Sequence, residues 1–106
     1  MSDRMAQLQK LHELDPFDAF LTYGIALEHA KADEPADAVI WLDKTLGLDQ
    51  NYFYAYFQKA KALSELGEEE EAKAAAREGF ERARAAGDEK AAGELGELLS
   101  NLEVLD

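Results

Sequence analysis

The chain has 106 residues, 47% of them hydrophobic, which is enough for one compact core and too little for two. Its formal net charge is −12, so its surface repels phosphate backbones and anionic lipid, and we expect neither nucleic acid nor a membrane as a partner. It contains no cysteine, which excludes disulfides, thiolate nucleophiles and cysteine-ligated zinc.

The N-terminal segment, residues 1–14, lacks the continuous apolar core and the small-residue cleavage site of a secretory signal. No apolar run approaches the roughly 20 residues that a membrane-spanning helix needs. The absence of cysteine also fits a reducing compartment. Together these features predict a cytoplasmic protein with an acidic, well-solvated surface.

Helix-forming residues dominate the chain, and it contains only 2 prolines. This composition predicts an all-α fold of antiparallel helical hairpins with about six helices. From the apolar spacing we place the helices at about 3–14, 17–31, 36–47, 52–66, 69–86 and 88–103.

The first helix repeats features of the third at a fixed separation. Leu8 precedes Leu42 by 34 residues, and Leu14 precedes Leu48 by the same number. A constant separation of this length is typical of stacked helical repeats. The first helix therefore reads as the second half of an incomplete repeat, covering residues 1–15.

The second helix matches the fourth at a longer separation. Phe20 aligns with Tyr56, and Gly24 aligns with Ala60, each pair 36 residues apart. We attribute the difference of two residues to an insertion in the turn at 31–37, where Pro35 suits the first turn of the following helix.

The third and fifth helices carry the clearest repeat. The pairs that keep the 34-residue separation are Ala38 with Ala72, Leu42 with Ala76, Thr45 with Gly79, and Leu46 with Phe80. They form the stripe that an amphipathic helix presents to a core. Before the fifth helix, Gly67 suits a helix end that needs positive φ, and the glutamates at 68–71 favour a helix N-terminus.

The last helix follows Gly87, a stop signal, and Asp88, a candidate N-cap. Its apolar residues lie along one face: Leu95, Leu98, Leu99, Leu102 and Leu105. A stack of repeats must cover the apolar face of its final member, so this helix reads as a cap. We therefore predict one domain over 1–106, divided into a half-repeat (1–15), repeat 1 (16–48), repeat 2 (49–86) and a capping helix (87–106).

These residues resemble the tetratricopeptide repeat. The matching positions are Phe20, Tyr23, Gly24, Leu27, Ala38, Leu42 and Thr45 in the first repeat, and Tyr56, Lys59, Ala60, Leu63, Gly67, Ala72, Ala76 and Gly79 in the second. Asp15-Pro16 resembles the pair that commonly closes a preceding repeat. The sequence departs from the pattern at Gln50, which replaces a proline, at Lys59, which replaces an apolar residue, and at Gly79, a poor helix former.

The resemblance implies a module that binds a peptide or helix of a partner protein on the concave face of the stack. Mapped onto this sequence, the positions on that face are Asp18, Leu21, Ile25, Glu28 and His29, and then Tyr54, Phe57, Lys61, Ser64 and Glu65. We expect Leu21, Ile25, Tyr54 and Phe57 to form an apolar groove. Glu28 and Lys61 would set the orientation of the bound segment.

An aromatic run at 52–57 supports this groove because its five aromatic residues cannot all face one core. Tyr54 and Phe57 are left to point outward, and an exposed aromatic patch usually marks a contact surface. Two alternatives stay open: the N-terminal helix covers the patch, or a second copy of the chain fills it in a homo-oligomer.

No arrangement of residues predicts an enzyme. The chain has no His-x-x-x-His pair, no glycine-rich phosphate loop and no nucleophile elbow. His12 and His29 lie on different predicted helices without a spaced set of other ligands, so we predict no metal site and no cofactor. His12 and Trp41 are expected to pack at helix interfaces.

Overall fold

The structure of the protein is a computed structural model, and it describes residues 2–104. Over this range the all-α prediction is confirmed, with six helices, each within two residues of its predicted bounds. They are α1 (Asp3–Leu14), α2 (Ala19–Lys31), α3 (Pro35–Leu48), α4 (Phe53–Glu65), α5 (Glu69–Ala86) and α6 (Glu89–Val104). Leu105 of the predicted cap lies outside the described residues.

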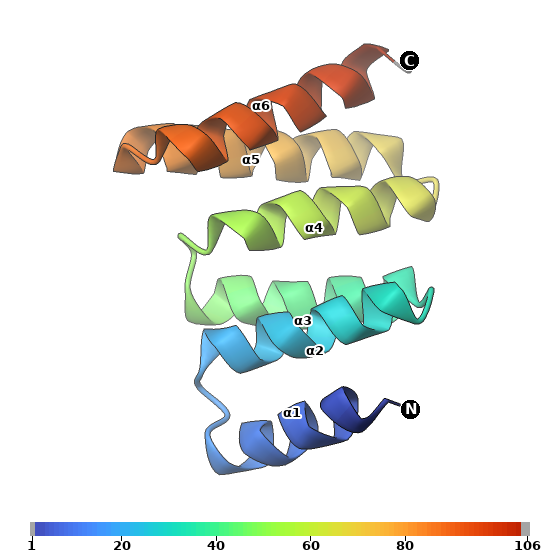
Figure 1. The fold of residues 1–106 in the computed structure, drawn as a ribbon. Coiled ribbons are helices and arrows are strands. Elements are labelled where there is room, and N and C mark those ends of the chain that lie inside the picture. The colour runs from blue at the N-terminus through green and yellow to red at the C-terminus, as the bar shows by residue number, and fades with distance from the viewer. Residues whose placement is uncertain (1, 105–106) are drawn as a thin grey trace.

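Successive helices run antiparallel and stack in chain order (Figure 1). In this view α2, α4 and α6 lie in a front layer, and α3 and α5 lie behind them. Each front helix packs against the rear helices next to it in the chain, and the front helices also touch one another. The arrangement leaves one broad face of the stack built from α2, α4 and α6.

Local sequence signals define where the helices begin. The Ser2 hydroxyl accepts a hydrogen bond from the Met5 N–H at 3.0 Å, and the Asp18 carboxylate accepts one from the Phe20 N–H at 2.9 Å. Asp88 caps α6 in the same way, through the Ala91 N–H at 3.0 Å. These side chains satisfy backbone donors that would otherwise have no partner at a helix start.

The predicted two-residue insertion between repeats is wrong. α2 begins at Ala19 and α4 at Phe53, a separation of 34 residues, and α3 and α5 begin 34 residues apart as well. The turn between α2 and α3 has the same length as its counterpart because Asp33, with φ 60°, adopts the left-handed conformation of Gly67, with φ 79°. Aspartate tolerates this conformation better than most residues, so the turn needs no glycine.

Burial follows the uniform 34-residue separation. The buried residues Leu21, Thr22, Ala26 and Glu28 on α2 correspond to the buried residues Ala55, Tyr56, Ala60 and Ala62 on α4. The 36-residue alignment had matched small residues to small residues, such as Gly24 to Ala60. Packing instead matches positions, and it lets the size of the side chain vary between repeats.

One interior position shows this exchange of volume. In repeat 1, the hydroxyls of Thr22 and Thr45 lie 2.8 Å apart in the core. In repeat 2, the same two positions hold Tyr56 and Gly79, and a Cβ on Gly79 would lie 2.5 Å from the Cβ of Tyr56. The large tyrosine side chain thus requires a glycine opposite it, which explains the poor helix former inside α5.

Helix α1 covers one side of α2. Its two buried residues, Met5 and Leu8, form one cluster with Leu21 and Ile25. Gly24 allows this approach, because a Cβ at that position would lie 3.1 Å from Leu8. α1 therefore occupies the place that the rear helix of a preceding repeat takes in a longer stack.

Candidate partner-binding surface

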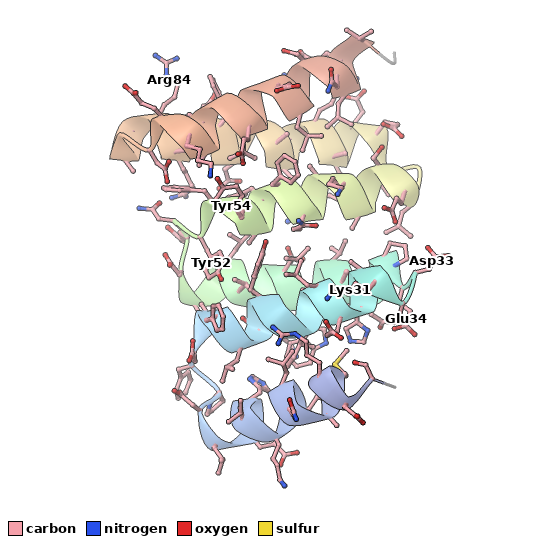
Figure 2. All side chains as sticks on the ribbon, viewed as in Figure 1. Lys31, Asp33, Glu34, Tyr52, Tyr54 and Arg84 are labelled. Atoms are coloured by element: carbon pink, nitrogen blue, oxygen red, sulfur yellow. The ribbon has the colours of Figure 1, made fainter. Side chains whose placement is uncertain are left out.

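The layer of α2, α4 and α6 carries a set of side chains that the core does not fully bury. In the 34-residue register, the members on α2 and α4 are Phe20, Tyr23, Leu27, Ala30 and Lys31, and Tyr54, Phe57, Lys61, Ser64 and Glu65. Figure 2 shows Lys31, Tyr52 and Tyr54 on this face, which is turned toward the viewer. We call it the front face.

A first hollow on the front face lies between α2 and α4 and has a volume of about 280 Å³. Its lining is Leu27, Ala30, Lys31, Pro35, Gln58, Lys61, Ala62 and Glu65. The floor is mainly apolar, and the ammonium groups of Lys31 and Lys61 stand on opposite sides. Lys31 also forms an ion pair with Glu28 at 3.2 Å. This hollow can accept an apolar side chain with a negative group near it.

A second hollow, of about 220 Å³, lies between α4 and α6. It is lined by Phe57, Glu94, Glu97, Leu98 and Asn101. Phe57 and Leu98 supply apolar surface, and two carboxylates from α6 supply negative charge. The two hollows flank α4, so they lie side by side on the front face and differ in charge.

Tyrosines gather at one end of the front face. The rings of Tyr23 and Tyr52 have centroids 4.7 Å apart. Burial raises the pKa of Tyr23, and burial together with the nearby charges of Asp18 and Asp49 raises the pKa of Tyr52. These hydroxyls therefore stay protonated at neutral pH and can donate hydrogen bonds.

Tyr54 belongs to the same end and connects it to α6. Its hydrogen bond to Glu94 is the largest cause that raises the pKa of Tyr54, and burial adds to it. The protonated hydroxyl thus holds the Glu94 carboxylate beside the second hollow.

The structure corrects part of the groove expected from the sequence. Leu21 and Ile25 are 8% and 0% exposed, because Met5 and Leu8 of α1 cover them. They lie in the interface between α1 and α2 and do not line an open groove. The open alternative in which the N-terminal helix covers a patch therefore applies to this half of the predicted surface.

Glu28, from the same predicted set, holds α1 in place. Its carboxylate accepts a hydrogen bond from the Ser2 hydroxyl at 2.8 Å and lies 3.6 Å from Arg4. The hydrogen bonds from Ser2 and Lys31 are the largest causes that lower the pKa of Glu28. Glu28 is thus an anchor for the start of α1.

The other half of the predicted set lies on the front face. Tyr54 and Phe57 are half-buried and pack along the edge of a core cluster around Leu95. Phe57 lines the second hollow and Lys61 lines the first. The Lys61 ammonium lies 5.8 Å from the centre of the Phe57 ring.

Sequence reasoning missed Leu27, Ala30 and Lys31, which line the first hollow. The signal was present: the 34-residue separation that relates α3 to α5 also places Leu27 at the position of Lys61. The assumed insertion displaced the assignment on α2 by two residues, and a helix turns by about 200° over two residues.

A wider hollow of about 510 Å³ lies beside the start of α1 and the turn between α2 and α3. At its edge, His29, Glu34 and Asp37 bring ligand atoms within 4.8 Å of one another. The His29 Nδ1 already lies 3.0 Å from a Glu34 carboxylate oxygen, and both acids are exposed. These groups satisfy one another or water, so the expectation of no metal site stays a prediction.

The second histidine packs as expected. His12 is half-buried, and its ring meets Trp41 edge-on with centroids 5.2 Å apart. Its Nδ1 is buried without a hydrogen-bond partner among residues 2–104. Within the same range, no helix has the length and hydrophobicity needed to cross a bilayer.

No protein-family model matches the sequence, and no curated protein matches it. Solved structures do. A tetratricopeptide repeat domain protein from Salinibacter ruber, solved by NMR, matches with a TM-score of 0.80 and 29% identity, over 87% of this chain and 93% of that one.

Two complexes share the fold at lower identity. The TPR2B domain of yeast Sti1, in a complex with pHsp70, has a TM-score of 0.89 and 20% identity, over 96% of this chain and 82% of that one. PcrH, in complex with the chaperone binding region of PopD, has a TM-score of 0.88 and 21% identity, over 94% and 76%. The stacked hairpins, their 34-residue register and these neighbours together identify the fold of this chain as that of the tetratricopeptide repeat.

Proposed function

We propose that the chain is a protein-interaction module that binds a peptide or helical segment of a partner protein across the front face. The observation that carries this proposal is the pair of hollows on either side of α4. Each combines an apolar lining with charged groups at its edge, which is the composition expected of a site that anchors a few side chains and orients them.

The neighbouring structures support the same kind of role. The yeast Sti1 domain was solved with pHsp70, and PcrH was solved with a region of PopD. Both are domains of this fold that hold part of another protein. By analogy we assign this chain a binding role rather than a catalytic one.

Within the front face, the proposed contact residues are Leu27 and Lys31 on α2, and Tyr54, Phe57 and Lys61 on α4. Leu21, Ile25 and Glu28 contribute indirectly, because they hold α1 against α2 and so support the first hollow. Half-buried aromatic residues such as Phe57 carry large contact area at little entropic cost.

The test uses a 12-residue random peptide library displayed on phage and selected on the immobilised full chain. We expect enriched sequences, and we expect the Leu27→Ala/Phe57→Ala variant to lose most of their binding. The matched control is Ile40→Ala, which truncates an apolar side chain that is 53% exposed on α3, in the rear layer. Circular dichroism would verify that all variants keep their helices.

Two outcomes would overturn the proposal. One is a selection that enriches nothing, and the other is enriched peptides that bind the double variant and the wild type equally. If sedimentation shows a dimer that Phe57→Ala dissociates, a second copy of the chain occupies the front face, and the homo-oligomer replaces the peptide partner.

A further inference from the structure

The second hollow differs from the first in the charge that it presents. Its apolar part consists of Phe57 from α4 and Leu98 from α6, and its polar part consists of Glu94, Glu97 and Asn101 from α6. Glu94 and Glu97 are three residues apart on one helix, so their carboxylates lie on the same face. An aromatic ring, an aliphatic side chain and two acids thus surround one small space.

The two acids are not neutralised by the rest of the described chain. Neither Glu94 nor Glu97 forms a salt bridge within residues 2–104. Glu94 interacts with the Tyr54 hydroxyl, which orients the carboxylate but supplies no positive charge. Filling the hollow with an apolar side chain would therefore strip water from two carboxylates without replacing its hydrogen bonds.

One cation lies close by. The Lys61 ammonium is 5.8 Å from the centre of the Phe57 ring, on the side of the first hollow. It balances one of the two acids and leaves an excess of one negative charge at the second hollow. Its position also shows that a cation can approach the Phe57 ring.

We propose that the second hollow binds an arginine side chain of the partner segment. This inference rests on the proposed function, because it specifies what one part of the front face recognises. The aliphatic stem of arginine would pack on Leu98, and its planar guanidinium would stack on Phe57 and donate hydrogen bonds to Glu94 and Glu97. A lysine offers a single point charge without the planar fork, so it fits this set of groups less well.

The direct test is a titration of the isotope-labelled full chain, followed by NMR, with N-acetyl-arginine amide. The comparison ligand is N-acetyl-citrulline amide, which has the same shape but a neutral urea group. We expect saturable shifts centred on Phe57, Glu94, Glu97 and Leu98. Arginine should bind roughly threefold or more tightly than citrulline, from one ion pair and one cation–π contact at a partly exposed site.

Three single substitutions sharpen the test. Glu97→Gln removes one carboxylate and should weaken the arginine probe by roughly two- to fivefold. Lys61→Gln removes the competing cation and should strengthen it. Glu81→Gln is the matched control, because it makes the same charge change at an exposed position on α5 and should leave the affinity unchanged.

Several results would overturn the inference: equal binding of arginine and citrulline, no saturable shift, shifts centred elsewhere, or an effect of Glu97→Gln no larger than that of Glu81→Gln. The phage selection separates this failure from failure of the proposed function. If selected peptides bind the front face but show no preference for arginine, the interaction role stands and the arginine site does not. If they carry arginine and lose affinity for the Glu97→Gln variant, both stand.

Discussion

Replacing Gly79 with alanine should destabilise the protein, although alanine is the better helix former. The added Cβ would lie 2.5 Å from the Cβ and 2.9 Å from the Cγ of Tyr56, and 3.2 Å from a methyl group of Leu95. The nearest atom is next to the backbone of α4, so a change of rotamer cannot move it away. The axes of α4 and α5 must separate instead, which opens the core around Leu95.

The magnitude follows from two opposing terms. Overpacking a well-filled core costs about 1–3 kcal/mol, and replacing glycine by alanine inside a helix contributes about 1 kcal/mol in the other direction. Gly93 on α6 isolates the second term, because a Cβ there would meet nothing within 4 Å. We therefore expect Gly93→Ala to stabilise the protein, and Gly79→Ala to be less stable than Gly93→Ala by about 1–3 kcal/mol.

Urea denaturation followed by circular dichroism measures both variants against the wild type, with the slope of each transition checked for constancy. In thermal melts the same difference corresponds to roughly 4–8 °C per kcal/mol for a domain of this size. If Gly79→Ala proves as stable as Gly93→Ala, the close approach of α4 and α5 at Tyr56 is wrong.

Four further predictions concern the turn, the N-terminal helix and the titrating groups. Asp33→Gly should stabilise the protein by about 1 kcal/mol, because φ at this position is 60° and glycine lacks the Cβ that opposes it; unchanged urea stability would contradict this. Leu8→Ala should cost about 2 kcal/mol or more through the cavity left beneath α1, and hydrogen exchange should rise first in α1. The pKa of Glu28 is lowered in the folded chain, so its contribution is present above the unfolded value near 4.5 and is lost as pH falls through the folded value; Glu28→Gln should flatten this acid limb of the stability curve. The pKa values of Tyr23 and Tyr54 are raised, so their contribution is present below pH 10 and is lost as pH rises above it; the double phenylalanine variant should remove part of the alkaline loss seen in urea titrations.

Helix positions and the stacking of hairpins could be predicted because they depend on neighbours in the chain. Capping side chains such as Asp88 and positive-φ glycines such as Gly67 act within a few residues, and the structure has them where the sequence predicted. The 34-residue separation between α3 and α5 was visible for a related reason. Small residues such as Ala38 and Ala72 recur where two helices approach closely.

The register of α2 was harder to predict because size alone does not identify a packing position. Thr22 with Thr45, and Tyr56 with Gly79, fill the same interior space with different divisions of volume. An alignment that pairs small residues with small residues misses such an exchange. The left-handed Asp33 concealed the equal turn lengths further, since glycine is the usual marker of that conformation.

The sequence by itself determined the all-α composition, the helix boundaries and the repeating hairpin, because propensity, capping and amphipathic spacing are local properties. Only the tertiary structure decided which side of α2 is covered. The contact of α1 with Leu21 and Ile25 joins residues far apart in the chain, and it depends on the direction in which each helix is rotated. A shift of two residues turns a helix through more than half a circle, so this rotation determines which side chains remain open to a partner.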